Sequence, residues 1–355
     1  MNPSALFKKP LVGLDIGISG IKALEVSSPS KPKIVAYNRI PFPIDTITAD
    51  GEFKNRSLVV LGLKKLFERN RFSSKRVAVN AFGNKVLTKR ITVPKMSENE
   101  LLNQLYFEAE QYIPFNISEV NVDFVILGRN LQTQAESPMM DVLIVAAKKD
   151  AIQNTVSILE EAGLKACMID NPAFALGNAF EFNYKKQMGN ASCAVIDFGA
   201  GSTKISIVEK EKTVFSRELR QSGNTCTEML SDRLGIGLEQ AEKMKIEESS
   251  TPTLKPIVQE FVGLLVDEIA RSLDFWAGQS NGNHLQAAFY CGGGSLLEGL
   301  CSTLESKLSF PLKPFNGLLQ VPDTSKSLTP KMIQEIKTIG QVSLGLALRH
   351  VGDKK

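Results

Sequence analysis

Apolar residues recur with two different spacings along this chain, and the two spacings predict strands mixed with helices. Short continuous apolar runs predict strands at residues 76–79, 86–92, 122–127, 142–146 and 287–290. Apolar residues three and four positions apart predict helices between the strands, the longest over residues 256–276. Its inward face is expected to carry Phe261, Leu265, Ile269 and Leu273. Strands mixed with helices favour an α/β fold.

Helix start signals add detail to this pattern. Ser57 and Asp150 are candidate N-caps, and Ser97 with Glu100 forms a capping-box pattern. Pro172 suits the first turn of another helix. The final helix is expected to contain Val342, Leu346 and His350. No low-complexity linker interrupts the pattern, so we expect a compact body of two lobes with a cleft.

The most informative pattern is an internal repeat. Residues 11–26 read LVGLDIGISGIKALEV, and residues 193–208 read CAVIDFGAGSTKISIV. Aligned without gaps, the two copies share three positions, which are Asp15 and Asp197, Gly17 and Gly199, and Lys22 and Lys204. Each copy reads as an apolar strand, a Gly/Ser turn and a second apolar strand, which predicts a β-hairpin. Because the copies lie about half the chain apart, we expect each lobe to begin with one.

Glycine-rich hairpins suit the binding of a polyphosphate, because main-chain amides can approach its oxygens without hindrance from side chains. The candidate phosphate-binding residues are Gly17, Ser19, Gly20 and Lys22 in the first copy and Gly199, Gly201, Ser202 and Thr203 in the second. Mg²⁺ keeps most of its waters and sits on one or two carboxylates, so Asp15 and Asp197 are the candidate metal residues, acting through water. One such hairpin alone would favour an ordinary turn, whereas two matching D-x-G-x-x-x-x-K copies favour a phosphate site.

A third glycine cluster follows the strand predicted at residues 287–290. Residues 288–300 read AFYCGGGSLLEGL, and a helix is expected to follow directly. The cluster adds four candidate residues, Gly292, Gly293, Gly294 and Ser295. Such a turn lets a flat ring or a phosphate lie against bare backbone. A lone GGG is also typical of an ordinary loop, and it gains weight here because it comes third, after two phosphate hairpins.

Composition and charge exclude several other classes of protein. The 355 residues include 42 basic and 38 acidic ones without a long basic run, so nucleic-acid binding is not expected. The five cysteines are scattered and form no CxxC pair, which favours reduced thiols in a cytoplasmic protein. His284 and His350 have no metal-ligand spacing around them, so neither a zinc site nor a histidine-based catalytic triad is expected. No apolar stretch reaches the roughly 18 residues that a membrane span needs.

The order DIGISGIK, DFGAGSTK, GGGSLLEG resembles the phosphate-1, phosphate-2 and adenosine motifs of the actin, sugar-kinase and Hsp70 superfamily. The resemblance implies an actin-like (ribonuclease H-like) α/β fold, with ATP and Mg²⁺ held between two lobes. QSGNTCTEML and LGIGLEQAEKMKI are similar to the G-G-N and A-E-x-x-K segments of the FtsA and MreB branch. They add Gly223 and Asn224, the latter near the sugar, and Glu242 and Lys245 facing ribose and adenine. Taken alone, Glu242 and Lys245 would be interpreted as two surface charges on a helix.

A more particular resemblance lies at residues 98–124, where ENELLNQLYFEAEQYIPFNISEVNVDF is similar to the signature of the PilM family of type IV pilus assembly proteins. IGQVSLGLALRHVG resembles the closing helix of that family, so the resemblance covers essentially the whole chain. It implies a division into lobes and subdomains. These are a first lobe at 1–190 (1A, with an FtsA-type 1C subdomain at about 86–165), a second lobe at 191–340 (2A, with 2B at about 225–280), and a C-terminal helix at 341–355 returning to 1A.

The resemblance to the PilM family also implies a function. Members are cytoplasmic ATP-binding scaffolds, peripheral to the inner membrane, that bind the N-terminal cytoplasmic peptide of PilN and contact the pilus motor ATPases. The membrane is then reached only through partners. We expect a groove involving the 1C subdomain to take the peptide, with the alternative that Tyr112, Ile113 and Phe115 simply fill the 1C core.

Hydrolysis of ATP is expected to be slow at most. In the FtsA and MreB pattern, a Glu before the Pro of E-P-x-A positions the attacking water. The matching residues here are Asp170-Asn171-Pro172-Ala173, so Asn171 is the water-positioning candidate and cannot take a proton. Asp170 is one position off and is expected to point elsewhere.

Three alternatives belong to the same superfamily. A small-molecule kinase would need a carboxylate base, for which only Asp123 or Asp170 suggests itself. An FtsA-like cell-division protein would carry an amphipathic membrane helix after the core, and we expect none because the sequence ends at Lys355. A GspL-like secretion protein would carry a membrane span after this domain, which is not expected either.

Overall fold

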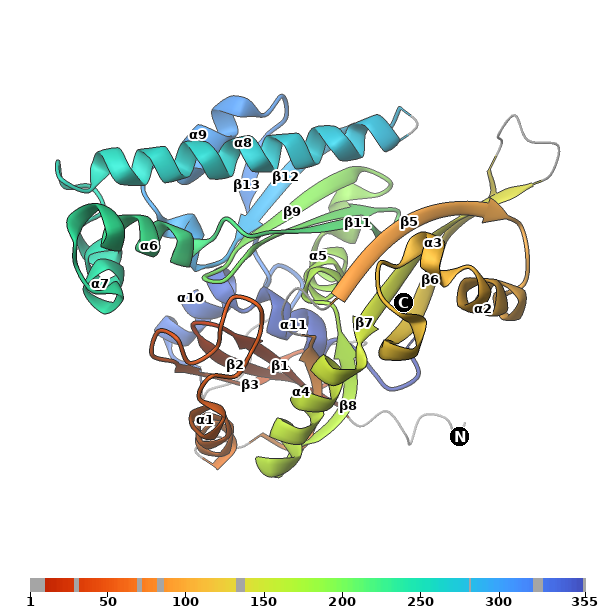
Figure 1. The fold of residues 1–355 in the computed structure, drawn as a ribbon, viewed down its shortest axis with the longest axis horizontal. Helices are drawn as coiled ribbons and strands as arrows, with labels where there is room; N and C mark the ends of the chain where they lie inside the picture. The colour runs from red at the N-terminus through yellow and green to blue at the C-terminus, as the bar shows by residue number, and fades with distance from the viewer. Residues whose placement is uncertain are drawn as a thin grey trace.

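Two five-stranded sheets and one three-stranded sheet organise the described part of the chain. The computed structural model describes residues 10–28, 32–68, 72–81, 86–131, 138–280, 282–321 and 328–353. Figure 1 shows one large sheet in the lower half of the molecule, the other in the upper half, and the three-stranded sheet to one side. The two large sheets have the same strand order and the same strand senses, so the repeat seen in the sequence extends beyond the hairpins.

The first large sheet has the order β3-β2-β1-β4-β8. Its strands are β1 (Val12–Gly17), β2 (Gly20–Val26), β3 (Ile34–Pro41), β4 (Arg76–Asn80) and β8 (Lys165–Asp170). β1 pairs antiparallel with β2 and parallel with β4, which confirms the predicted hairpin. Helix α1 (Arg56–Glu68) packs on β2 and β3, and α4 (Lys149–Glu161) packs on β8. Their apolar faces meet Val12, Leu14 and Ile16 of β1 in one buried core.

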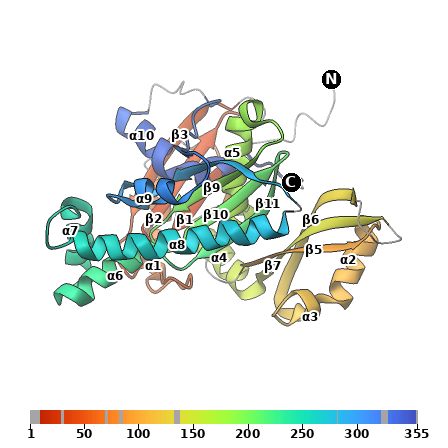
Figure 2. The same cartoon turned by 90° about the horizontal axis from the view of Figure 1, so that it is seen from above.

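The second large sheet has the order β11-β10-β9-β12-β13. Its strands are β9 (Ser192–Phe198), β10 (Thr203–Glu209), β11 (Lys212–Leu219), β12 (Leu285–Cys291) and β13 (Leu312–Pro314). Helices α6 (Gly223–Leu234), α7 (Leu238–Glu248) and α8 (Lys255–Gln279) lie between β11 and β12 in the sequence, and α9 (Leu300–Lys307) lies between β12 and β13. The predicted inward face of α8 is confirmed, because its four apolar residues are buried in one core with β9 and β10. Figure 2 shows α8 running along the outside of this sheet.

Helices α5 (Pro172–Met188) and α11 (Gln341–Ala347) lie between the two large sheets (Figure 1). α11 packs on β1, β2 and β4, α5 packs on β9, β10 and β11, and the two helices contact each other. The contact depends on glycine, because a Cβ added at Gly345 would lie 1.7 Å from the carbonyl oxygen of Ala175. A Cβ added at Gly13 would similarly lie 2.0 Å from the carbonyl oxygen of Ser343, so β1 also approaches α11 backbone to backbone. Helix α10 (Pro330–Ile339) leads into α11.

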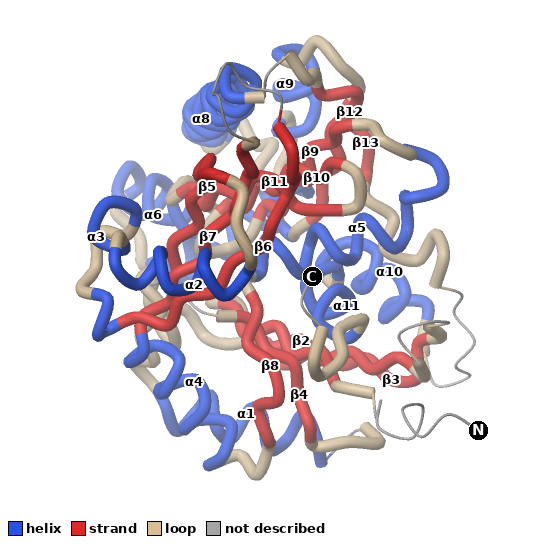
Figure 3. The backbone as a smooth tube through the Cα atoms, turned by 90° about the vertical axis from the view of Figure 1, so that its right-hand side faces the viewer, coloured by secondary structure: helices blue, strands red, loops and turns tan. Residues whose placement is uncertain are grey.

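The three-stranded sheet has the order β5-β7-β6 and stands beside the two large ones (Figure 2). Its strands are β5 (Val86–Pro94), β6 (Val120–Leu131) and β7 (Met139–Lys148), with α2 (Glu98–Phe107) and α3 (Ala109–Tyr112) between β5 and β6. The predicted capping box of α2 is confirmed in both directions between Ser97 and Glu100. β5 runs beside β11 of the second sheet, where the hydroxyls of Thr88 and Ser216 lie 2.8 Å apart (Figure 3).

Three local predictions are wrong. Ser57 is not the cap of α1, because the helix begins one residue earlier and Asn55 accepts a hydrogen bond from its backbone at 3.0 Å. Asp150 lies in the first turn of α4, whose N-cap is Lys148. His350 lies beyond the end of α11. Each error concerns a helix end, where several polar residues compete and small geometric differences decide.

The glycine contact between α5 and α11 generates a stability prediction. Gly345→Ala is expected to lower the free energy of unfolding by about 1–3 kcal/mol, because a methyl group has no room against Ala175. Gly263→Ala in α8 is the matched control, because an added Cβ there meets nothing within 4 Å, and the change should stabilise the helix by about 1 kcal/mol at most. Urea unfolding of both variants measures the difference. A Gly345→Ala protein as stable as the wild type would contradict the close crossing.

Candidate functional site

The two glycine hairpins present the same arrangement of charged residues. In the first hairpin Asp15 lies opposite Lys22 and Gly17 lies opposite Gly20. In the second hairpin Asp197 lies opposite Lys204. Each hairpin therefore ends with an aspartate and a lysine side by side on neighbouring strands, just before a glycine-containing turn. This is the geometry that the sequence repeat predicts.

A cavity of about 460 Å³ lies between the two hairpins. Most of the residues singled out in the sequence line it. They are Asp15, Gly17, Ser19, Lys22, Asp197, Gly199, Gly201, Ser202, Thr203, Gly223, Glu242, Lys245, Gly292, Gly293 and Gly294. Segments from the start, the middle and the later part of the sequence therefore converge on one cleft, as the motif order predicts.

Four of the candidate residues do not line the cavity. Gly20 has a φ of +144° and an added Cβ would strike the carbonyl of Ile40, so this glycine shapes the hairpin instead. Asn224 donates its backbone N–H to Ala200 at 2.8 Å and ties the start of α6 to the second hairpin. Ser295 donates its hydroxyl to the carbonyl of the first glycine in the third cluster at 2.7 Å. The fourth is Asn171, described below.

The third glycine cluster requires bare backbone. Gly292 has a φ of +90°, and a Cβ added there would lie 2.4 Å from Oδ1 of Asp197 and 2.5 Å from the carbonyl oxygen of Phe198. The chain then forms a short 3₁₀ helix over Gly293–Leu296, and α9 begins only at Leu300. The helix therefore starts later than the sequence predicted. The close approach of the cluster to β9 explains why the position next to Asp197 needs a glycine.

Glu242 and Lys245 are not two surface charges. Lys245 is 11% exposed, and its ammonium lies 2.6 Å from Glu242. It also donates to the carbonyl of Gly223 at 2.8 Å and to the hydroxyl of Thr227 at 2.7 Å. Helix α7 is thus fastened to the start of α6, and both charges face the cavity. The surface alternative is wrong for this pair.

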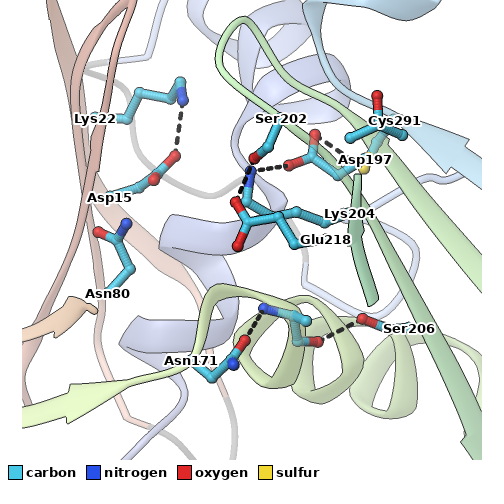
Figure 4. Close-up of polar contacts among 12 residues, drawn as sticks. Asp15, Lys22, Asn80, Asn171, Asp197, Ser202, Lys204, Ser206, Glu218 and Cys291 are labelled. Atoms are coloured by element: carbon cyan, nitrogen blue, oxygen red, sulfur yellow. Dashed lines mark hydrogen bonds and ion pairs between the residues drawn. The ribbon is translucent and has the colours of Figure 1, made fainter. Parts of the chain in front are cut away.

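Each candidate metal carboxylate already has a lysine beside it (Figure 4). The ammonium of Lys22 lies 2.7 Å from Oδ2 of Asp15. The ammonium of Lys204 lies 3.7 Å from Oδ2 of Asp197, whose Oδ1 lies 3.9 Å from the thiol of Cys291. Burial raises the pKa of the Cys291 thiol well above its usual range, and the negative charge of Asp197 adds to that effect, so the thiol stays protonated. Both carboxylates are therefore held by neighbours within the protein.

Asn171 has a structural role in this structure. It is the N-cap of α5, and its side-chain oxygen accepts a hydrogen bond from the backbone of Ala173 at 2.8 Å (Figure 4). Asp170 points away, as predicted, because it forms a 2.8 Å ion pair with Arg349. Burial raises the pKa of Asp170, and the guanidinium of Arg349 opposes that effect. Neither Asp170 nor Asp123, the two carboxylates considered for a kinase, lines the cavity.

The sequence analysis missed several lining residues. Asn80, at the end of β4, accepts a hydrogen bond from the backbone N–H of Ile16 at 2.8 Å and donates to its carbonyl at 2.9 Å. It thereby fixes the end of β1 next to the first turn. The others include Arg39, Lys204, Glu218, Ile339 and Gln341. Lys204 could have been found from the repeat, where it matches Lys22, and Asn80 from its place at the carboxyl end of a strand parallel to β1.

The residues of this cavity fit a nucleotide with Mg²⁺. Bare glycine backbone lies on three sides, and lysine side chains from both hairpins face the same space. No group of three or more His, Cys, Asp or Glu side chains arranged for a metal occurs in the described part of the chain. Mg²⁺ held through its own waters by one or two carboxylates needs no such group. Asp15 and Asp197 satisfy that smaller requirement.

The repeated sheets and the cleft between their hairpins define an actin-like fold. A solved structure described as the PilM-PilN type IV pilus biogenesis complex contains a chain with a TM-score of 0.85, 28% sequence identity, and coverage of 97% of this chain and 99% of that chain. Ethanolamine utilization protein EutJ from Carboxydothermus hydrogenoformans has a TM-score of 0.57 at 15% identity, over 97% of this chain and 93% of that one. At that level of identity the likeness to EutJ concerns the fold alone.

Sequence comparison then identifies the family. The family model for the type IV pilus assembly protein PilM matches residues 13–351, and the chain belongs to that family. Cell division protein FtsA of Bacillus subtilis (strain 168) is 24% identical over 267 residues, which cover 69% of this chain and 58% of FtsA. EutJ of Escherichia coli (strain K12) is 26% identical over 182 residues, which cover 50% of this chain and 56% of EutJ. The alignments thus span less than two thirds of these relatives.

Among the described residues, no helix combines the length and apolar character of a membrane span.

Proposed function

We propose that this chain is an ATP-binding scaffold of the type IV pilus assembly platform, and that its partner is the N-terminal cytoplasmic peptide of PilN. The observation that carries the proposal is the PilM family match over residues 13–351, supported by the likeness to a chain of the PilM-PilN complex. The proposal places the protein in the cytoplasm, peripheral to the inner membrane through PilN. Contact with the pilus motor ATPases is part of the same proposal and follows from the family resemblance.

The proposed nucleotide site uses both hairpins at once. The glycine backbones and hydroxyls of the two turns would bind the phosphates, and Lys22 would add a positive charge. Asp15 and Asp197 would hold the waters of Mg²⁺, which neutralises phosphate charge when bound. Glu242, Lys245 and the third glycine cluster would enclose the nucleoside. Because these residues come from both sheets, a bound nucleotide would favour the conformations in which the lobes lie close together.

Nucleotide binding provides the first test of this function. Lys22→Ala is expected to raise the Kd for ATP at least about tenfold, because it removes a positive charge that faces the phosphates. Asp197→Ala is expected to raise the Kd by less than about tenfold in Mg²⁺, because it removes one of the two carboxylates that would hold the waters of the metal. Lys212→Ala is the matched control, since Lys212 is exposed on β11 and bonds the carbonyl of Ile126. Calorimetry in millimolar Mg²⁺ measures all three. An absence of binding heat for the wild-type protein would contradict the nucleotide site.

The proposed partner surface lies on the three-stranded unit, which we assign to the 1C subdomain within the lobe division given above. Ile113 is buried in its core with Tyr112 and Phe115 packed against it, so these three side chains do fill the core. Helix α2 carries other apolar side chains that face outward. Phe107 is 92% exposed and Tyr106 is also exposed. An extended peptide with apolar residues would cover them.

The partner surface is tested by a double substitution. Tyr106→Ser with Phe107→Ser is expected to weaken binding of a peptide with the PilN N-terminal sequence at least about tenfold, because two exposed apolar anchors are lost. Leu264→Ser, at an exposed apolar position on α8, serves as the control. Fluorescence anisotropy of a labelled peptide measures the affinity. If the double variant binds the peptide with unchanged affinity and still binds nucleotide, the partner surface does not include Tyr106 and Phe107.

The proposal also includes slow hydrolysis of ATP, so that nucleotide binding is the functional event. The side-chain oxygen of Asn171 is engaged as a helix cap, and Asp170 is held by Arg349. Among the described residues, the entrance to α5 therefore offers no free carboxylate to take a proton from water. Lack of a positioned base typically removes about 10²–10⁴-fold in rate.

Single-turnover hydrolysis tests the role of Asn171. The wild-type rate is expected to lie below about one per second, the lower end of ordinary enzyme turnover. Asn171→Glu should raise it at least about tenfold by supplying a base, while Asn171→Ser, which can still cap α5, should not. A faster wild-type protein would refute slow hydrolysis. Equal rates in the two variants would show that this helix cap does not face the attacking water.

A further inference from the structure

Each large sheet carries a row of three charged side chains that runs across neighbouring strands. Strand register places them opposite one another, Asp15–Lys22–Arg39 on β1, β2 and β3, and Asp197–Lys204–Glu218 on β9, β10 and β11. Residues directly opposite on neighbouring strands point to the same face of a sheet. All six line the cavity between the lobes. The lysine is the middle member of each row.

The rows differ in the sign of their third member. Lys22 stands between an aspartate and Arg39, and Arg39 itself forms a 3.2 Å ion pair with Glu335 of α10. Lys204 stands between two acids, Asp197 and Glu218. The first row therefore carries one net positive charge, and the second carries one net negative charge.

In the second row, Lys204 lies between the two acids and balances one of their negative charges from within the chain. Its side chain is 17% exposed and lies 3.7 Å from Asp197. Asp197 and Glu218 flank this ammonium on the two neighbouring strands, and their negative charges stabilise its positive charge. Glu218 is held in turn by the hydroxyl of Ser202 in the turn of the second hairpin (Figure 4). The other oxygen of Asp197 faces the thiol of Cys291.

We propose that Lys204 is a built-in counter-cation for Asp197, which lets a nucleoside polyphosphate bind without a metal and makes Mg²⁺ compete with the lysine. The proposal rests on the proposed nucleotide-binding function and adds a regulation of that site by divalent metal. Asp197 is the candidate metal carboxylate, so a Mg²⁺ ion approaching it meets the ammonium of Lys204 a few ångströms away. Repulsion between like charges at such distances is large inside a protein. The same ammonium is a point charge available to phosphate oxygens.

The measurement that tests this is the ratio of two dissociation constants for ATP, one in EDTA and one in millimolar Mg²⁺. For the wild-type protein the ratio should lie below about ten, because Lys204 replaces part of the metal's charge. Lys204→Gln should raise the ratio at least about tenfold, since metal-free binding loses a cation while Asp197 becomes free for Mg²⁺. Lys204→Arg keeps the charge and should leave the ratio close to that of the wild type. Lys212→Gln, at an exposed lysine of β11, is the surface control.

The outcomes separate this inference from the function on which it rests. If ATP binds but the ratio is the same in wild type and Lys204→Gln, the role of Lys204 is refuted and the nucleotide site stands. If the ratio for the wild-type protein exceeds about ten, the inference is also refuted. If no variant binds ATP in either buffer, the proposed function fails and the inference fails with it. Circular dichroism establishes whether Lys204→Gln folds. If it does not, Lys204→Met, which also removes the charge, is measured in its place and is expected to give the same raised ratio.

Discussion

The backbone-to-backbone contact of α5 with α11 fixes how far apart the two large sheets stand. Gly345 lets α11 approach Ala175 of α5, and Gly13 lets β1 approach α11 from the other side. The glycine hairpins project from these sheets, so the width of the cavity between them follows from this one helix pair. A larger residue at either glycine would collide with backbone and push the two sheets apart. The cavity thus depends on packing at residues that do not line it.

The parts of the fold that the sequence predicted are those specified by residues close together along the chain. The two hairpins, the long amphipathic α8 and the capping box of α2 were predicted, because each is specified by residues a few positions apart. Asn80 was missed, because its bond to the backbone of Ile16 joins strands far apart in the sequence. The pairing of each aspartate with its lysine also depends on strand register, which the repeat could suggest but not fix.

Charge in the cleft is divided between the lobes, and this division arises from single positions on edge strands. Arg39 and Glu218 occupy equivalent places in the two sheets with opposite signs. Two sheets with the same strand order therefore present unlike charges to one cavity.

The position of α11 has a consequence for how the protein is made. Strand β1 is among the first described elements of the chain, yet the helix that covers one of its faces is the last. A ribosome releases the chain from the N-terminus onward, so this face of β1 stays uncovered until α11 has been synthesised. During that time the face that includes Gly13 is open to other chains. Contacts between such distant segments also slow folding.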